Sequence, residues 1–170
     1  MLALLSSCFL VVASFLPSGS TPSGWPDFSG TWVAIAPIPQ YVQVGEKAWA
    51  PDYVPTFGQR FTARQSGAVL EIEGRVESPS KPFPVVTTIR LDGTSSEYMS
   101  IPPYKDVAVA SWEGETLLVT SRTVEPKPLE GHEMKRWFTL KPDGTLEIVT
   151  ELHVSKEPKK WTSVYKREQQ

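Results

Sequence analysis

The chain has 170 residues, of which 40% are hydrophobic and 21% are charged. This length and composition are typical of one globular domain with a sizeable core, and they exclude a disordered chain. A formal net charge of -2 excludes a strongly basic nucleic-acid binder, and Lys and Glu alternate along the chain, which predicts a mixed, solvated surface.

Residues 1–16 (MLALLSSCFLVVASFL) carry no charge and are followed at once by Pro17 and small residues. The run is too short to span a bilayer as a stable helix, and an apolar segment followed by small residues is typical of a secretory signal peptide. We therefore expect residues 1–20 to be a signal peptide, cleaved near Ser20, and the protein to be exported to the periplasm or the medium. Because no Lys or Arg stands at the start, an uncleaved membrane anchor is the alternative.

The one cysteine, Cys8, lies inside this segment. Residues 5–8 (LSSC) resemble a bacterial lipoprotein box, in which the cysteine would be lipidated. Cleavage without a lipid is favoured over this lipid anchor, because a strongly apolar run follows Cys8 where a lipoprotein would have a polar tether. A mature chain without Cys8 has no thiol and therefore no disulfide, thiolate metal ligand or cysteine nucleophile.

Residues 21–29 (TPSGWPDFS) are rich in Pro and Ser and predict a linker that leads into a domain over residues 30–168. Residues 30–36 (GTWVAIA) predict the first strand of that domain. Residues 37–55 combine prolines with aromatic residues, and each proline removes a backbone donor and restricts the residue before it. We expect a long loop there, which either forms a lid over the domain or wraps its outside.

From residue 57 onward, apolar and polar residues alternate between turn signals. Leu70, Ile72 and Val76 alternate with charged residues, which is the period-two pattern of a half-buried strand. The pairs Ser-Gly at 66–67 and Asp-Gly at 143–144 are typical of hairpin turns. The pattern predicts strands over residues 57–65, 68–76, 85–91, 97–101, 107–112, 116–124, 134–141, 145–154 and 160–166.

No segment has helical periodicity. The sequence contains no repeat of fixed period, so we do not expect a propeller. Consecutive hairpins imply an up-and-down meander, and closing the sheet removes its exposed edges. The expected fold class is all-β, an antiparallel up-and-down barrel of about 8–10 strands, with a two-sheet sandwich as the alternative.

Three segments are similar to known barrels. Residues 27–32 (DFSGTW) contain Gly-x-Trp, which resembles the opening strand of the calycin group: lipocalins, fatty-acid-binding proteins and avidins. Residues 112–117 (WEGETL) and 137–146 (WFTLKPDGTL) resemble hairpins of secreted bacterial lipocalin-like proteins of uncharacterised function. The resemblance implies a lipocalin-like barrel and says more about fold than about activity.

The resemblance also implies a contact that closes the barrel. Residues 164–167 (VYKR) are similar to the last strand of such barrels, where a basic residue covers the first-strand tryptophan. Arg167 would then lie over Trp32 in a cation–π contact, with Gly30 as the third residue of the closing set.

Apolar side chains on the predicted strands are the candidates for lining a ligand cavity, because a barrel of this size can enclose one small ligand. The alternative is that they fill the core. Trp137 and Phe138 are adjacent, so one points inward and the other outward. The candidate ligand-binding residues are Trp32, Phe61, Leu70, Ile72, Ile89, Trp112, Trp137 and Phe138.

Catalytic and metal-binding patterns are not found. His132 and His153 are the only histidines, no third ligand is placed near them, and we expect both to be solvated and no metal to bind. The acidic residues are dispersed, and the sequence has no Gly-x-Ser-x-Gly elbow, phosphate loop or dinucleotide fingerprint. We therefore predict no catalytic residues and no cofactor.

The expected function is non-catalytic binding of a small hydrophobic ligand inside the barrel of an exported bacterial protein. The alternative is an envelope interaction or structural domain with a filled core and no ligand. We expect no nucleic-acid partner, and contact with a membrane only through an uncleaved N-terminal segment. The sequence does not define the oligomeric state.

Overall fold

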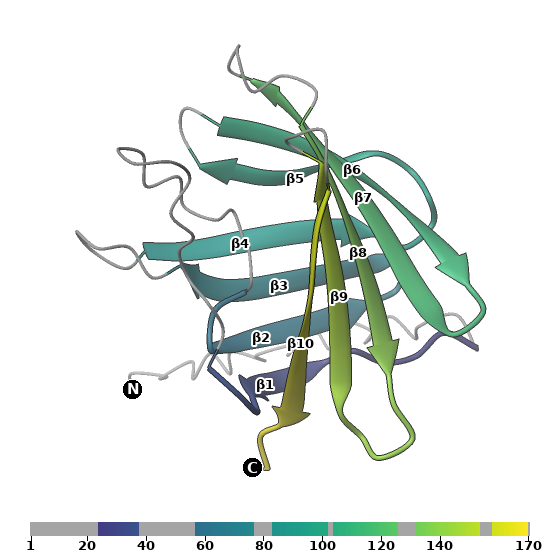
Figure 1. The fold of residues 1–170 in the computed structure, drawn as a ribbon. Coiled ribbons are helices and arrows are strands. Elements are labelled where there is room, and N and C mark those ends of the chain that lie inside the picture. The colour runs from purple at the N-terminus through teal and green to yellow at the C-terminus, as the bar shows by residue number, and fades with distance from the viewer. Residues whose placement is uncertain are drawn as a thin grey trace, which may run out of the picture.

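The structure is a computed structural model that describes residues 24–37, 57–76, 83–101, 104–125, 132–153 and 158–169. These residues form ten strands (Figure 1). No helix in this part of the chain is long and apolar enough to cross a membrane. The predicted signal peptide over residues 1–20, Cys8, and nearly all of the predicted loop over residues 37–55 lie outside the described residues.

The strands follow one another at short intervals, at positions close to those that the alternation predicts. They are β1 (Gly30–Ala34), β2 (Arg60–Ser66), β3 (Val69–Val76), β4 (Phe83–Arg90), β5 (Ser96–Ile101), β6 (Tyr104–Glu113), β7 (Thr116–Glu125), β8 (Glu133–Leu140), β9 (Leu146–His153) and β10 (Lys159–Arg167).

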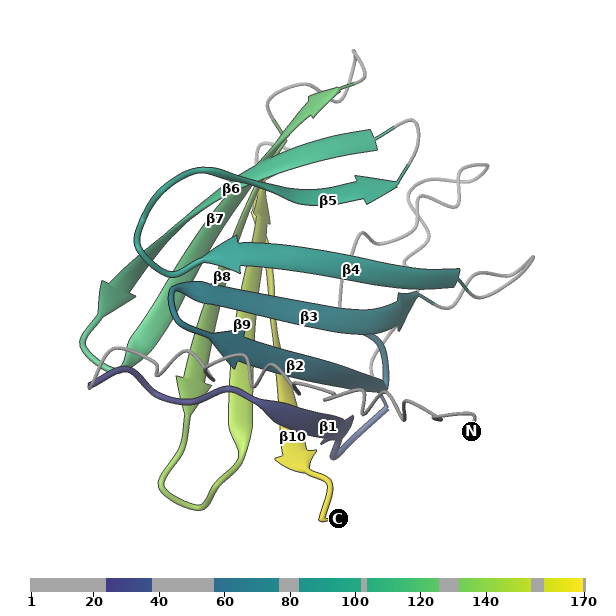
Figure 2. The ribbon, with the colours of Figure 1, turned by 180° about the vertical axis from the view of Figure 1, so that it is seen from behind.

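All ten strands belong to one antiparallel sheet in the order β4-β3-β2-β1-β10-β9-β8-β7-β6-β5. The sheet curls until its two outer strands, β4 and β5, lie beside each other (Figure 2). No backbone ladder joins β4 to β5 within the described strands, but the Ser96 hydroxyl donates to the Thr88 carbonyl at 3.1 Å across this seam. The fold is therefore a nearly closed up-and-down barrel, which confirms the predicted fold class over the sandwich.

Two local features explain why these residues form hairpins. Even-numbered residues of β9, from Leu146 to Leu152, are buried and the residues between them are half-buried, as a two-faced strand requires. The β8–β9 turn contains Gly144 with φ 80°, a conformation that favours glycine. In the same turn, an Asp143 carboxylate oxygen accepts from the Thr145 backbone N–H at 2.9 Å and hydroxyl at 2.7 Å. These hydrogen bonds lower the pKa of Asp143.

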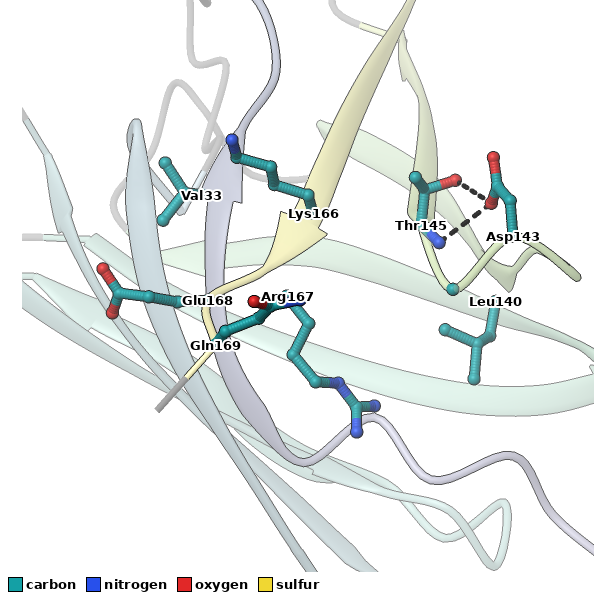
Figure 3. A pocket seen from close by; sticks show the side chains of 9 residues that line it. Val33, Leu140, Asp143, Thr145, Lys166, Arg167, Glu168 and Gln169 are labelled. Atoms are coloured by element: carbon teal, nitrogen blue, oxygen red, sulfur yellow. Dashed lines mark hydrogen bonds between the residues drawn. The ribbon is translucent and has the colours of Figure 1, made fainter.

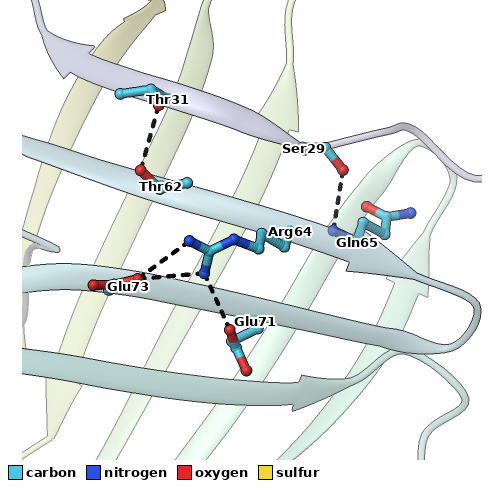
Figure 4. Close-up of polar contacts among 7 residues, drawn as sticks. All are labelled: Ser29, Thr31, Thr62, Arg64, Gln65, Glu71 and Glu73. Atoms are coloured by element: carbon cyan, nitrogen blue, oxygen red, sulfur yellow. Dashed lines mark hydrogen bonds and ion pairs between the residues drawn. The ribbon is translucent and has the colours of Figure 1, made fainter.

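Polar side chains cover the outer face of β1, β2 and β3 (Figure 4). The hydroxyls of Thr31 and Thr62 are hydrogen-bonded at 3.3 Å. Arg64 forms ion pairs of 3.3 Å with both Glu71 and Glu73. Such exposed pairs contribute at most about 1 kcal/mol each to the free energy of unfolding. They make this face hydrophilic but stabilise the barrel little.

The chain enters β2 by crossing closely over β3 at two glycines. A Cβ at Gly74 would lie 2.5 Å from the carbonyl oxygen of Phe57, and a Cβ at Gly58 would collide with the Arg75 carbonyl. The Arg75 N–H donates to the Phe57 carbonyl at 3.4 Å. Because neither glycine has a side chain, the backbones approach closely enough for Phe57 to turn into the barrel, where it is 5% exposed.

This crossing predicts that Gly74→Ala destabilises the protein by about 3 kcal/mol, because the neighbouring backbone cannot give way. The urea midpoint measures the effect. Gly67→Ala is the control: Gly67 has φ 55° and nothing within 4 Å of its Cβ position, so only about 1 kcal/mol of backbone strain is expected. Equal midpoints for the two variants would contradict the close crossing.

Candidate functional site

Inward-facing residues of the strands form one continuous core. Six of the eight predicted lining residues lie in it and are at most 2% exposed: Trp32, Phe61, Leu70, Ile72, Ile89 and Phe138. Trp112 is half-buried and packs against this core.

Trp137 lies on the outer face of β8. It is half-buried, between the buried residues Arg136 and Phe138, and adjacent residues of a strand point to opposite faces. The Lys160 ammonium lies 5.2 Å from the centre of the Trp137 ring. Trp137 therefore does not line the interior, and of the two adjacent aromatic residues it is Phe138 that points inward.

The three residues that the resemblance implied lie together at one end of the barrel, which we call the closed end. Trp32 is fully buried, and its indole N–H donates to the Phe28 carbonyl at 2.9 Å. The Arg167 guanidinium carbon lies 4.9 Å from the centre of the Trp32 ring, and its Nη2 donates to the Asp27 carbonyl at 3.1 Å. A Cβ at Gly30 would lie 3.3 Å from the Arg167 side chain, so glycine leaves Arg167 room to lie over the ring.

Aromatic rings occupy the part of the interior next to the closed end. Each ring contacts the next with centroid distances between 4.9 and 6.2 Å. Such contacts contribute roughly 0.5–1.5 kcal/mol beyond area burial. We call this set the aromatic cluster: Trp25, Trp112, Phe28, Phe138, Phe57, Phe61 and Tyr165. Three predicted lining residues, Phe61, Trp112 and Phe138, belong to this cluster. Their rings pack against other rings, as the alternative of a filled core describes.

A buried arginine borders the aromatic cluster. Arg136 is the next inward residue of β8 after Phe138, on the side away from the closed end, and it is 1% exposed. Its Nη1 donates to the Tyr98 hydroxyl, and its guanidinium carbon lies 5.1 Å from the centre of the Phe57 ring. Burial lowers the pKa of Arg136 to about 9, and the nearby Tyr165 phenol acts in the opposite direction. The barrel thus holds a cation where ionisation is costly.

Further polar groups share the inward face with Arg136. Thr150 lies opposite both Arg136 and Trp161 in the strand register, so the three side chains point to the same side of the sheet. We call Arg136, Tyr98, Thr150 and Trp161 the polar layer. The Trp161 indole N–H is buried and has no hydrogen-bond partner in the part of the chain that the structure describes. Because an unpaired buried donor costs about 1–3 kcal/mol, this group can gain from a partner.

Thr87, an inward residue of β4, also has a buried polar group without a hydrogen-bond partner among the described residues. This group is its hydroxyl, and the residue is 0% exposed. It lies opposite Ile72 in the register, next to the seam between β4 and β5. The indole N–H of Trp112, in the aromatic cluster, is likewise buried and has no hydrogen-bond partner in the described part of the chain.

A second ionisable group faces inward farther from the closed end. Asp106 on β6 lies opposite Thr123 on β7, and Thr123 is two residues beyond the buried Ser121. Burial raises the pKa of Asp106, and a hydrogen bond from the Thr123 side chain opposes that shift. The inward face therefore contains ionisable groups of both charge signs besides the neutral polar groups described above.

The histidines lie away from this interior set. His153 Nε2 lies 2.7 Å from a Glu151 carboxylate oxygen on the outer face of β9, and the His132 carbonyl accepts from the Thr123 N–H at 3.0 Å. No group of three His, Cys, Asp or Glu side chains could hold a metal ion within the described ranges.

An open groove of about 1090 Å³ lies outside the barrel, beside the closed end (Figure 3). Three of its four charged side chains already have other contacts: Arg167 covers Trp32, Glu168 pairs with Arg60 at 2.5 Å, and Asp143 holds the β8–β9 turn. This groove is therefore a weaker candidate than the interior. It is lined by Val33, Leu140, Asp143, Gly144, Thr145, Lys166, Arg167, Glu168 and Gln169.

Sequence reasoning missed the polar layer. The signal was available in β8, where Met134, Arg136 and Phe138 occupy alternate positions and therefore share a face. Because Arg136 is charged, the sequence alone suggests that its side chain is exposed. Only the burial of its neighbours shows that it lies inside the barrel.

Comparison of the chain with models of protein families and with curated proteins found no match in either set. We therefore infer a function from the geometry of the barrel.

The contact at the closed end predicts that Arg167→Ala lowers the free energy of unfolding by about 1 kcal/mol, since an exposed cation–π contact is lost. Arg167→Lys should retain part of it, because the charge remains. Urea unfolding followed by tryptophan fluorescence measures both. The control, Lys166→Ala, changes the adjacent exposed residue and should cost less than about 0.5 kcal/mol. Equal losses at 166 and 167 would mean that Arg167 does not stabilise the closed end.

Proposed function

We propose that this protein binds, without catalysis, a small amphipathic molecule inside the barrel, with an acidic group of the ligand at Arg136. The observation that carries the proposal is a buried cation in a largely apolar barrel. The aromatic cluster occupies the closed end, so the apolar body of the ligand extends from Arg136 in the opposite direction.

The apolar part of the proposal is supported by the wall beside and beyond Arg136. Val119 lies next to Arg136 in the register, and Met134 and Leu152 form the next inward pair. All three are buried. Burying apolar ligand area against such side chains is favourable by about 25 cal/mol per Å².

The acidic part of the proposal is supported by the hydrogen-bonding types in the polar layer. Guanidinium and indole groups donate and do not accept, so a ligand with lone pairs can bond both to Arg136 and to the Trp161 indole N–H, which has no partner among the described residues. A carboxylate fits best, because hydrogen bonds between charged groups are about twice as strong as neutral ones. It would also raise the pKa of Arg136 toward its ordinary value, since an anion favours the protonated guanidinium.

A structural domain without a ligand is the second candidate, and the aromatic cluster favours it. Rings already occupy one part of the interior, and the same packing would serve a domain whose only task is to be stable. In that case Arg136 is a costly core residue with no binding role. The binding experiment below separates the two functions.

We also propose that the barrel is lipocalin-like and that the protein is exported. The closing contact of Trp32 and Arg167 supports the first, and the uncharged run over residues 1–16 supports the second. N-terminal sequencing of protein from a bacterial periplasm should give a first residue near 21. A chain that begins at Met1, or a lipid on Cys8, would contradict cleavage at this position.

The binding proposal predicts that isothermal titration calorimetry detects dodecanoate bound to the purified protein. Arg136→Met should weaken dodecanoate by about 10- to 100-fold, the loss of one charged hydrogen bond, and leave dodecanol nearly unchanged. Arg60→Met is the matched control on the outer face and should bind dodecanoate like the wild type.

Absence of dodecanoate binding to the folded wild type would favour the structural domain. Equal weakening of dodecanoate and dodecanol by Arg136→Met would place the acidic group elsewhere. Weakening by Arg60→Met would move the site to the outside of the barrel.

A further inference from the structure

We infer that the ligand carries a second polar group, a hydroxyl or carbonyl on its chain, which hydrogen-bonds to Thr87. The inference rests on the proposed function and narrows the ligand class from simple acids to oxygenated acids. It starts from a side chain that the packing of the barrel does not explain.

Thr87 is in an unfavourable environment for a hydroxyl. It is 0% exposed, lies opposite Ile72, and is flanked along β4 by the inward residues Val85 and Ile89. Its hydroxyl finds no partner among the described residues, although most buried threonines bond to backbone or to another side chain. Valine has nearly the same shape and would avoid this cost, so packing alone favours valine at this position.

The neighbouring seam does not satisfy the hydroxyl either. Among the described residues, the side-chain hydrogen bond across the seam runs from Ser96 to the carbonyl of Thr88, the residue after Thr87. Thr88 is half-buried and alternates with Thr87, so the two side chains lie on opposite faces of β4. The Thr87 hydroxyl therefore faces the interior, while the seam contact uses the backbone beside it.

The position of Thr87 relative to the polar layer sets the chemistry of the ligand. Going around the barrel, β5, β6 and β7 separate β4 from β8, so Thr87 and Arg136 lie on different walls (Figure 2). A ligand whose carboxylate bonds to Arg136 can also bond to Thr87 if its chain carries an oxygen at some distance from the acid group. A hydroxyl can donate and accept, so either an alcohol or a ketone on the chain fits.

The test uses dodecanoate and a series of hydroxydodecanoates that differ in the position of the hydroxyl. Calorimetry on the wild type should find one position that binds about three- to ten-fold tighter than dodecanoate, the gain of one neutral hydrogen bond. In Thr87→Val this preference should vanish or reverse, because the ligand hydroxyl is then buried without a partner. Dodecanoate itself should bind to both proteins equally.

A second measurement needs no ligand. Thr87→Val should raise the melting temperature of the ligand-free protein, because an unpaired buried hydroxyl is replaced by a methyl group. Thr116→Val is the matched control: the Thr116 hydroxyl is hydrogen-bonded to that of Thr139 at 3.0 Å, so its loss should not stabilise the protein.

The outcomes separate the two proposals. If the wild type binds no dodecanoate and no hydroxydodecanoate, the proposed function fails. If it binds dodecanoate but no hydroxylated acid binds tighter, or if Thr87→Val keeps the preference, the acid site stands and the role of Thr87 is wrong. A Thr87→Val protein that melts lower than the wild type would mean that the hydroxyl is already satisfied, and would also overturn the inference.

Discussion

The pairing of β1 with β10 is the constraint on which the rest of the structure depends. Every other ladder among the described strands joins strands that follow one another in the chain, and because no ladder joins β4 to β5, these hairpins alone would form two separate sheets, β1–β4 and β5–β10. Pairing Trp32 with Arg167 brings together the two ends of the domain and gives the sheet an inside and an outside. Trp32 is buried at this junction and Arg167 lies over its ring, so the contact that closes the barrel also covers its end.

Because the sheet is curled into a barrel, every second side chain of each strand points into one shared interior. That interior has two parts. The aromatic cluster fills the closed end and includes Phe57, which enters the barrel at the crossing of Gly58 and Gly74. Beside it, Arg136 and Thr87 are buried polar side chains, and the ligand that we propose would bond to both of them.

The strands and turns could be predicted because their signals are local: alternation within a strand, and a glycine in a turn such as Gly144. Which face of each strand points into the barrel could not be predicted, since alternation does not say which of Trp137 and Phe138 points inward. Arg136 was missed for the same reason, because a charged residue suggests an exposed face until its neighbours are known to be buried. The entry of Phe57 depends on Gly74, which is distant in the sequence and has no local signal.

Isotope-filtered NMR on the protein with ¹³C-labelled dodecanoate can show whether the barrel interior holds a ligand with its acid group at Arg136. Intermolecular NOEs are expected from the ligand protons next to the carboxyl group to Tyr98 and Trp161, and from the protons of the chain to Met134 or Leu152. NOEs confined to the outer groove beside Lys166, or none in a folded protein, would contradict binding at Arg136.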